Sequence, residues 1–294
     1  MMKTLRRPQF RYGVIVIVLI LAWYFLFSFR PIAMSLRIAL SDYQLLHPGS
    51  SPWVGVKHFQ TLLFDYSLFW KAVQNTAVYT LLITVVTVPL ALLLSSCLAQ
   101  VVRGRAFYQA AVFMPVVVSM AAVALMFRHL MDPNGILNHL LRDFGFPPYK
   151  WLVGADSAMP SIAAIEIWKG LGGNVVILLA GLLAIPKEFY DAAEVDGAGT
   201  LQRFRHITLP LLSPVLKLVI IIIIIGSLQA YTGVIILTNG GPARATLMMN
   251  QFVVSEAFDS LRLSLAASAS FFLFFATLAI TVFQLRLMRS KWEY

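Results

Sequence analysis

Six apolar runs, separated by shorter polar segments, dominate the chain. The runs cover residues 14–29, 72–99, 106–127, 161–185, 213–237 and 264–287. Each of the five later runs is at least about 20 residues long, which is the length that a helix needs to cross the hydrocarbon core of a bilayer. We therefore predict an all-α membrane protein, with a basic N-terminal stretch at residues 1–12 and a six-span transmembrane domain at residues 13–294.

Composition supports the membrane assignment and excludes several other classes. Charged residues make up 12% of the 294 residues, compared with about 25% in soluble domains. The net charge of +10 would favour nucleic-acid binding in a soluble protein, but the bases here lie in short loops and tails, so we expect membrane lipid and no nucleic acid as a partner. Cys97 is the single cysteine and the five histidines lack zinc-like spacing, so the sequence predicts no metal or redox site.

The distribution of basic residues predicts the orientation. The stretch MMKTLRRPQFRYG precedes the first apolar run and no small-residue cleavage motif follows it, which indicates an uncleaved signal anchor. With the N-terminus inside, residues 100–105, 186–212 and 288–294 are also inside. The inner segments then have the denser basic content, as the positive-inside tendency requires. We predict a multi-pass protein of the cytoplasmic membrane with both termini in the cytoplasm.

Two prolines interrupt apolar runs. Pro89 falls in the second run and Pro115 in the third, and membrane helices tolerate such breaks where neighbouring groups satisfy the freed carbonyl. They mark either packing kinks or helices that flex around a pathway, and the sequence leaves both open.

A long polar segment, EFYDAAEVDGAGTLQRFRHITLP, lies between the fourth and fifth runs. Pro186 suits the first turn of a helix, and Glu188 and Asp191 suit its positive N-terminal end. Gly197 and Gly199 can take the positive φ that ends a helix, and Thr200 can cap the next one. We predict a helix–turn–helix exposed to the cytosol at residues 186–210, although an ordinary polar loop would also satisfy the pattern.

Five separated motifs, in order, resemble one family. DAAEVDGAGTLQRFRHITLP is similar to the EAA loop of permease subunits of binding-protein-dependent ABC importers. WVGVKHFQTLL, NGILNHLLRDFG with WLVGADSA, IEIWKGLGGNVVILLAGLLAIPKEFYDAA and LTNGGPARAT resemble other segments of the carbohydrate branch. Their order best resembles the first of two paired permeases, of the maltose and glycerol-phosphate type.

The resemblance implies how the chain works. In that family the loop is a coupling helix seated in a groove of a cytoplasmic ATPase, with contact and turn positions that correspond here to Asp191, Ala192, Ala193, Asp196 and Gly197. Asp191 stands where the family usually has Glu, so the acid is one methylene shorter. The implied partners are a second permease in a heterodimer, two ATPase copies that hold ATP and Mg²⁺, and an external solute-binding protein. No cofactor is expected on this chain.

Polar and aromatic residues inside spans four and five are candidates for a substrate pathway. They are Glu166, Trp168, Lys169, Asn174, Gln229 and Tyr231. Ionisable groups at this depth are costly and indicate a pathway or a polar interface, and rings beside hydrogen-bonding groups suit sugars. Glu166 and Lys169, three residues apart, share a helix face and can also simply neutralise each other. TNGGPARAT is either a fixed turn or a landing site for the binding protein.

Two other functions compete with the permease. A membrane-embedded transferase-type enzyme would use Asp191 and Asp196 with His206, but these acids lie along a helix beside alanines. A self-contained secondary transporter often has two related halves, and we find no internal repeat. The phosphate-loop pattern G-x-x-x-x-G-K-[ST] does not occur. The favoured hypothesis is therefore a non-catalytic permease that passes a carbohydrate across the membrane.

Overall fold

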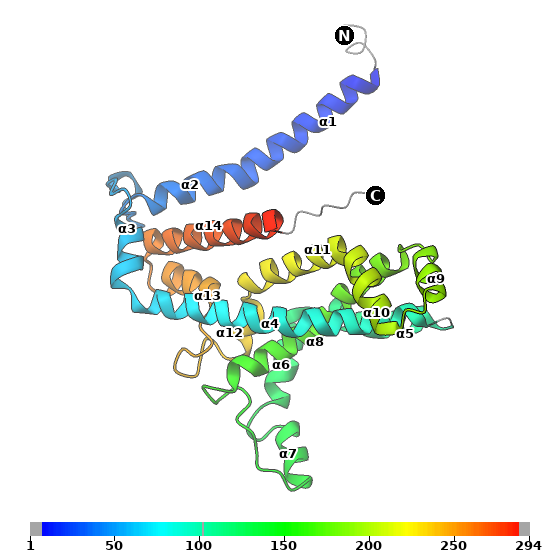
Figure 1. Ribbon diagram of the computed structural model, residues 1–294. Coiled ribbons are helices and arrows are strands. Elements are labelled where there is room, and N and C mark those ends of the chain that lie inside the picture. Colours follow the sequence, from blue (N-terminus) through cyan, green and yellow to red (C-terminus); the bar gives the residue numbers. More distant parts are fainter. Residues whose placement is uncertain (1–7, 102, 288–294) are drawn as a thin grey trace. The chain divides into compact units, whose positions relative to one another are not determined.

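The computed structural model describes residues 8–101 and 103–287, which are helical for most of their length (Figure 1). Within these residues extended pairing is limited to one bridge, between Ser41 and Trp53, so the all-α prediction is confirmed. The chain divides into two compact units: residues 1–67 with 253–272, and residues 68–252 with 273–294. Residues 1–7 and 288–294, which carry most of the terminal basic residues, lie outside the described part.

The first unit begins with one long, exposed helical stretch. It consists of helix α1 (Pro8–Tyr24), the π-helical turn η1 (Phe25–Phe29) and helix α2 (Arg30–Ala39), with no loop between them. The helical stretch therefore ends ten residues after the predicted apolar run. The remaining elements are η2 (Pro48–Ser50), α3 (Lys57–Gln60), η3 (Thr61–Asp65), η5 (Ser255–Asp259) and the beginning of α14 (Leu263–Leu287). Ala39, Ala267 and Phe271 form a small core, and the Ser268 hydroxyl donates to the Ala39 carbonyl over 3.2 Å.

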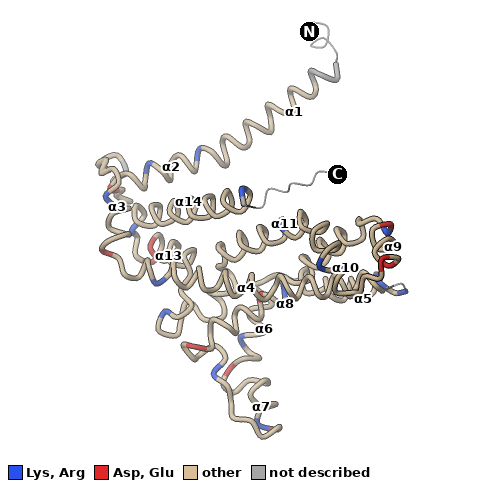
Figure 2. The backbone as a smooth tube through the Cα atoms, viewed as in Figure 1, with Lys and Arg blue, Asp and Glu red and all other residues tan. Residues whose placement is uncertain are grey.

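The second unit contains most of the buried apolar surface. Its elements are α4 (Ser67–Gln100), α5 (Arg105–Val117), α6 (Met120–Leu130), α7 (Ile136–Asp143), α8 (Ala158–Leu183), α9 (Glu188–Val195), α10 (Thr200–Arg203), the π-helical turn η4 (Phe204–Thr208), α11 (Leu209–Leu228), α12 (Thr232–Leu237) and α13 (Met249–Val254). One core joins α4, α6, α8, α11 and α12. Figure 2 shows most charged residues of this unit in its loops and short helices, with few along the long helices.

A glycine lets two of these helices approach closely. A Cβ at Gly172 of α8 would collide with the carbonyl oxygen of Val112 and lie 2.8 Å from Cα of Phe113, both in α5. The backbone of α5 therefore lies directly against α8 where α8 has no side chain.

The number and shape of the spans partly match the prediction. Five helical stretches of the described chain are long and apolar enough to cross a membrane: Tyr12–Ala39, Ser67–Gln100, Ala158–Leu183, Thr200–Leu228 and Leu263–Arg286. A sixth span exists only if α5 and α6 count as one, and they are bent by 88°. The predicted span at residues 106–127 is therefore two helices, and the sharp bend lies after Val117 rather than at Pro115. Val118 is extended, and Ser119 starts α6 afresh by accepting from the Ala122 N–H over 3.3 Å.

The fifth span begins and ends earlier than predicted. The helix runs from Thr200 to Leu228 rather than through residues 213–237. The chain breaks at residues 229–231, where Tyr231 has a φ of −147°, and the short helix α12 continues to Leu237. The Asn250 side-chain amide donates to the Gln229 carbonyl over 2.8 Å, which satisfies a carbonyl that the end of the helix leaves without a helical partner. At the other end, the wider turn η4 comes directly before α11, and Pro210 lies in the first turn of α11. Because of this wider turn, Pro210 does not interrupt the helix. The predicted second helix of the polar segment is therefore the beginning of this span.

Candidate functional site

The segment between α8 and α11 contains a short helix, a tight turn and the start of the long helix. Helix α9 ends at Val195, and Gly197 takes a φ of +74°. The Gly197 N–H donates to the Glu194 carbonyl over 3.0 Å, and the Ala198 N–H donates to the Ala193 carbonyl over 2.9 Å. These two bonds define a Schellman motif, which requires the left-handed backbone that glycine adopts readily.

The following turn differs from the prediction in its details. Gly199 has an extended backbone and is the N-cap of α10, a position that the sequence assigned to Thr200. The Gly199 N–H donates to the Gln202 side-chain oxygen over 2.9 Å. Pro186 also lies before α9, which begins at Glu188. Two glycines therefore separate the helices, one by positive φ and one by an extended conformation.

Side chains hold the segment in a fixed conformation. The Arg203 guanidinium donates to the Glu194 carboxylate over 3.0 Å, which joins the two sides of the turn. The hydroxyls of Tyr190 and Thr208 are 3.0 Å apart, and Thr208 is buried. Behind the segment lies a cavity of about 470 Å³ against the ends of α4 and α8. Its lining includes Gln100, Leu182, Tyr190 and Arg203.

The outer surface of the segment combines acids, small residues and exposed apolar side chains. Asp191, Ala192, Asp196 and Gly197 are exposed and Ala193 is half-buried, so all five predicted coupling residues lie on one short surface segment. Phe189, Val195 and Leu201 are also exposed, Val195 to 89%. Exposed apolar residues rimmed by charge are typical of a protein docking surface.

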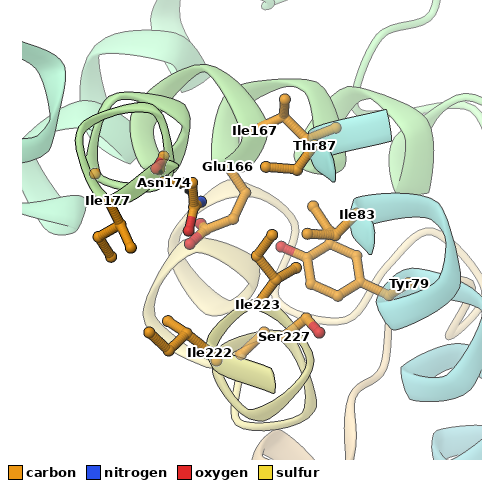
Figure 3. Close-up of a pocket in the computed structure, with 14 residues that line it drawn as sticks. Tyr79, Ile83, Thr87, Glu166, Ile167, Asn174, Ile177, Ile222, Ile223 and Ser227 are labelled. Atoms are coloured by element: carbon orange, nitrogen blue, oxygen red, sulfur yellow. Dashed lines mark hydrogen bonds between the residues drawn. The ribbon is translucent and has the colours of Figure 1, made fainter. Parts of the chain in front are cut away.

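A second candidate site lies among α4, α8 and α11. It is a cavity of about 280 Å³ (Figure 3). Five isoleucines, three glycines and Ala230 supply its apolar wall. The polar side chains are Tyr79, Thr87, Glu166, Asn174 and Ser227. Figure 3 shows the Glu166 carboxyl and the Tyr79 hydroxyl directed into the space between the three helices. The Glu166 carboxyl also lies close to the backbone of α12, 3.6 Å from where a Cβ at Gly233 would be.

Two of the six predicted pathway residues line this cavity, Glu166 and Asn174. Trp168 instead packs edge-on against Phe127, with ring centroids 5.5 Å apart. Gln229 is exposed, and its carbonyl receives the Asn250 amide. Neither Lys169 nor Tyr231 is among the lining residues. Within the described chain, the ion pairs closer than 4.0 Å do not include Glu166 with Lys169.

Sequence reasoning missed three polar residues of the cavity: Tyr79, Thr87 and Ser227. Tyr79 and Thr87 are eight residues apart on α4 with Ile83 between them, and a spacing of four puts all three on one helix face. This spacing inside an apolar run was a detectable signal. Ser227 lies close to the break that ends α11, which the sequence did not locate.

Two loops of this unit are held firmly by buried amides. Asn138 of α7 accepts from the Tyr149 N–H over 2.9 Å and from the Trp151 indole over 3.1 Å, and it donates to the Tyr149 carbonyl. In the TNGGPARAT segment, Asn75 of α4 donates to the carbonyls of Arg244 and Leu247 over 2.9 and 3.0 Å. The buried amides therefore hold the backbone of each loop in one conformation, which also fixes the positions of its exposed residues.

Among the described residues, no cluster of three His, Cys, Asp or Glu side chains could hold a metal ion. The two candidate sites are an exposed polar segment at α9–α10 and a polar cavity between helices.

The family described as "Binding-protein-dependent transport system inner membrane component" matches residues 67–290, more than half of the chain. The chain belongs to this family. It is 32% identical to the sn-glycerol-3-phosphate transport system permease protein UgpA of Agrobacterium fabrum, over 83% of this chain and 84% of that protein. It is 29% identical to the arabinooligosaccharides transport system permease protein AraP of Bacillus subtilis, over 87% and 82%.

Solved structures support the same fold. A chain of a bacterial alginate ABC transporter, in complex with an alginate-bound periplasmic protein, superposes with a TM-score of 0.84 at 23% identity. The superposition covers 98% of this chain and 96% of that one. The protein is accordingly a multi-pass inner-membrane permease subunit of an ABC transporter.

Proposed function

We propose that this chain is one of two different permease subunits of an importer that carries a carbohydrate across the cytoplasmic membrane. The relatives named above move arabinooligosaccharides, sn-glycerol-3-phosphate and alginate, which supports a sugar or a sugar derivative as cargo. The observation that carries the proposal is the ordered, exposed α9–α10 segment on a chain that otherwise consists mainly of apolar helices.

The segment is the docking surface for a separate ATPase. Its Schellman turn and the Glu194–Arg203 pair fix the relative direction of α9 and α10, so a partner meets a preformed surface. Asp191 and Asp196 supply charge at the rim, while Val195 and Leu201 supply apolar contact. Two ATPase copies bind ATP and Mg²⁺, one below each permease, and this chain carries no cofactor.

The polar cavity is part of the substrate pathway, and the second permease completes it. Hydroxyl, amide and carboxyl groups on an isoleucine wall suit a ligand with many hydroxyls and apolar C–H faces. An external binding protein delivers the sugar, in keeping with the periplasmic protein in the alginate transporter complex. In this arrangement the α9–α10 segment faces the cytoplasm, and both termini are also cytoplasmic. The fixed loop at residues 238–248 and α7 are on the outer side.

The transferase-type alternative has little geometric support. The His206 ring is 3.0 Å from the Gln202 carbonyl of its own helix. Asp191 and Asp196 are exposed, and neither makes a side-chain hydrogen bond or ion pair within the described chain. The three groups therefore do not form a hydrogen-bonded catalytic set.

Reconstitution tests the proposal. The complete transporter in proteoliposomes should import sugar when binding protein and ATP are supplied on opposite sides. This chain alone should show neither ATPase activity nor uptake. Robust uptake by the single chain would contradict the proposal, and so would failure of the complete assembly to import any sugar that its binding protein holds.

A further inference from the structure

We propose that Glu166 makes this permease discriminate against anionic sugars. On this view the pathway accepts uncharged and amino sugars and slows sugar phosphates and sugar acids. The inference rests on the proposed function, because it concerns the cavity that we assign to the substrate pathway.

The charge content of the cavity carries the argument. Of the fourteen lining residues, Glu166 is the one carboxylic acid, and none is Lys, Arg or His. Lys169 lies one turn further along α8, but it is not in the lining. Its ammonium group is not within 4.0 Å of the Glu166 carboxylate in the described chain. A ligand in this cavity therefore contacts one carboxylate and no cationic side chain among the lining residues, while the charge of Lys169 acts from beyond the lining.

The position of Glu166 makes this charge effective. Its carboxyl lies between α4, α8 and α11 and beside the backbone of α12, among five isoleucines and three glycines. The apolar part of this wall screens the charge less than water does, although Lys169 and the hydroxyl and amide groups of the lining offset part of it. Two like charges about 5 Å apart at an effective dielectric constant of about 20 repel enough to lower an equilibrium constant on the order of 100-fold.

The other polar groups fit a neutral polyhydroxylated ligand. The Thr87 hydroxyl is buried and has no hydrogen-bond partner within the described chain. Tyr79, Asn174 and Ser227 supply a phenol, an amide and a second hydroxyl. Each can exchange hydrogen bonds with sugar hydroxyls, whereas a phosphate or carboxylate needs charged donors to offset the loss of its hydration. The cavity wall therefore supplies hydrogen bonds to a neutral sugar, but it supplies no cationic group to neutralise the charge of an anion.

This assignment separates the chain from relatives of similar sequence. Two proteins compared above are named for anionic cargo, sn-glycerol-3-phosphate and the acidic polysaccharide alginate. An identity of 32% leaves room for one side chain to reverse the charge preference. The names of the relatives support a sugar or sugar derivative as cargo, and the charge of the cavity is the basis for the preference proposed among them.

Direct binding to the complete transporter without its binding protein tests the inference, because the binding protein imposes its own selection. Saturation-transfer NMR should compare three matched disaccharides: a neutral one, its uronate and its 2-amino derivative. In the natural protein the uronate should bind at least about tenfold more weakly than the neutral sugar. Glu166→Gln should bring the two affinities close together, and Glu166→Lys should reverse their order.

Glu166→Asp is the matched control, because it keeps the charge and removes one methylene. It should retain discrimination against the uronate even if overall affinity falls. Equal binding of uronate and neutral sugar by the natural protein would overturn the inference, as would discrimination that survives in Glu166→Gln. Both results would leave the proposed function intact, since that proposal fails only if the complete transporter imports no sugar held by its binding protein.

Discussion

The Arg203 guanidinium lies 3.0 Å from the Glu194 carboxylate, across the turn that separates α9 from α10. Glu194 is 73% exposed, so the pair should add less than about 1 kcal/mol to stability. The pair therefore biases the direction of α9 relative to α10 and adds little to the stability of the fold. We expect Arg203→Glu to leave expression unchanged and to lower co-purification of the ATPase several-fold. The double variant with Glu194→Arg should recover much of this binding, and no recovery would show that Arg203 acts independently of Glu194.

Gly197 is the position where the turn depends most on residue type. A Cβ there meets nothing within 4 Å, but φ is +74°, so substitution costs backbone strain alone. Gly197→Val should destabilise the turn by about 1–2 kcal/mol and weaken ATPase binding and uptake. Gly197→Asn should be close to the natural protein, because asparagine tolerates this backbone region better. Equal effects of Val and Asn on ATPase co-purification would contradict the strain argument.

Asp191 offers a gain-of-function test. The residue is exposed near the N-terminal end of α9, where an acid is favourable. Asp191→Glu restores the longer acid usual in the family that the loop resembles. It should keep or increase ATPase affinity, whereas Asp191→Asn should reduce it. Titration of purified ATPase onto the permease pair would measure both, and stronger binding by the Asn variant would refute a role for the charge.

Gly172 tests the packing of α5 on α8. A Cβ at this position would overlap the Val112 carbonyl oxygen, and backbone cannot move aside as a flexible side chain can. Gly172→Ala should therefore cost about 1–3 kcal/mol through overpacking and lower the thermal unfolding temperature in detergent. Gly13→Ala in the exposed helix α1, where a Cβ meets nothing within 4 Å, is the control and should be neutral or slightly stabilising. Similar losses in both variants would count against the packing argument.

Asn138 should be essential for the shape of its loop. Asn138→Ala removes the acceptor for the Tyr149 N–H and the Trp151 indole, which should cost about 1–3 kcal/mol. We expect faster hydrogen exchange and proteolysis within residues 132–157, together with weaker binding of the external binding protein. Asn134→Ala, on the exposed part of the same loop, should change neither. Unchanged protection in Asn138→Ala would exclude this role.

Much of the helical architecture follows from local sequence. Apolar runs about 20 residues long predict the long helices, and the ability of Gly197 to adopt a positive φ predicts the turn after α9. The break after α11 did not follow, because it involves a distant partner. Helix α11 ends where Asn250, 21 residues along the chain, takes the Gln229 carbonyl. Local pattern carries no trace of such a bond.

The site shows the same division. The exposure of the α9–α10 segment could be predicted, because it is polar and lies between two long apolar runs. The cavity could be only partly predicted: Glu166 and Asn174 are polar residues in an apolar helix, but their neighbours Tyr79 and Ser227 come from other helices. Trp168 does not line this cavity, and its ring packs edge-on against Phe127. Composition does not show the direction in which a side chain points.

The unbroken helix from Thr200 to Leu228 has a mechanical consequence. One of its ends follows the docking turn directly, and near the other end Ile223 and Ser227 form part of the cavity wall. At about 1.5 Å per residue, Thr200 and Ser227 are roughly 40 Å apart, but they belong to one rod. A tilt imposed at Thr200 would therefore reach the wall at Ser227 through continuous helix, in which the wider turn η4 and Pro214 are the places where bending can absorb motion. The helix would act as a lever. The ratio of the movement at Ser227 to the movement at Thr200 would depend on where α11 pivots against α8.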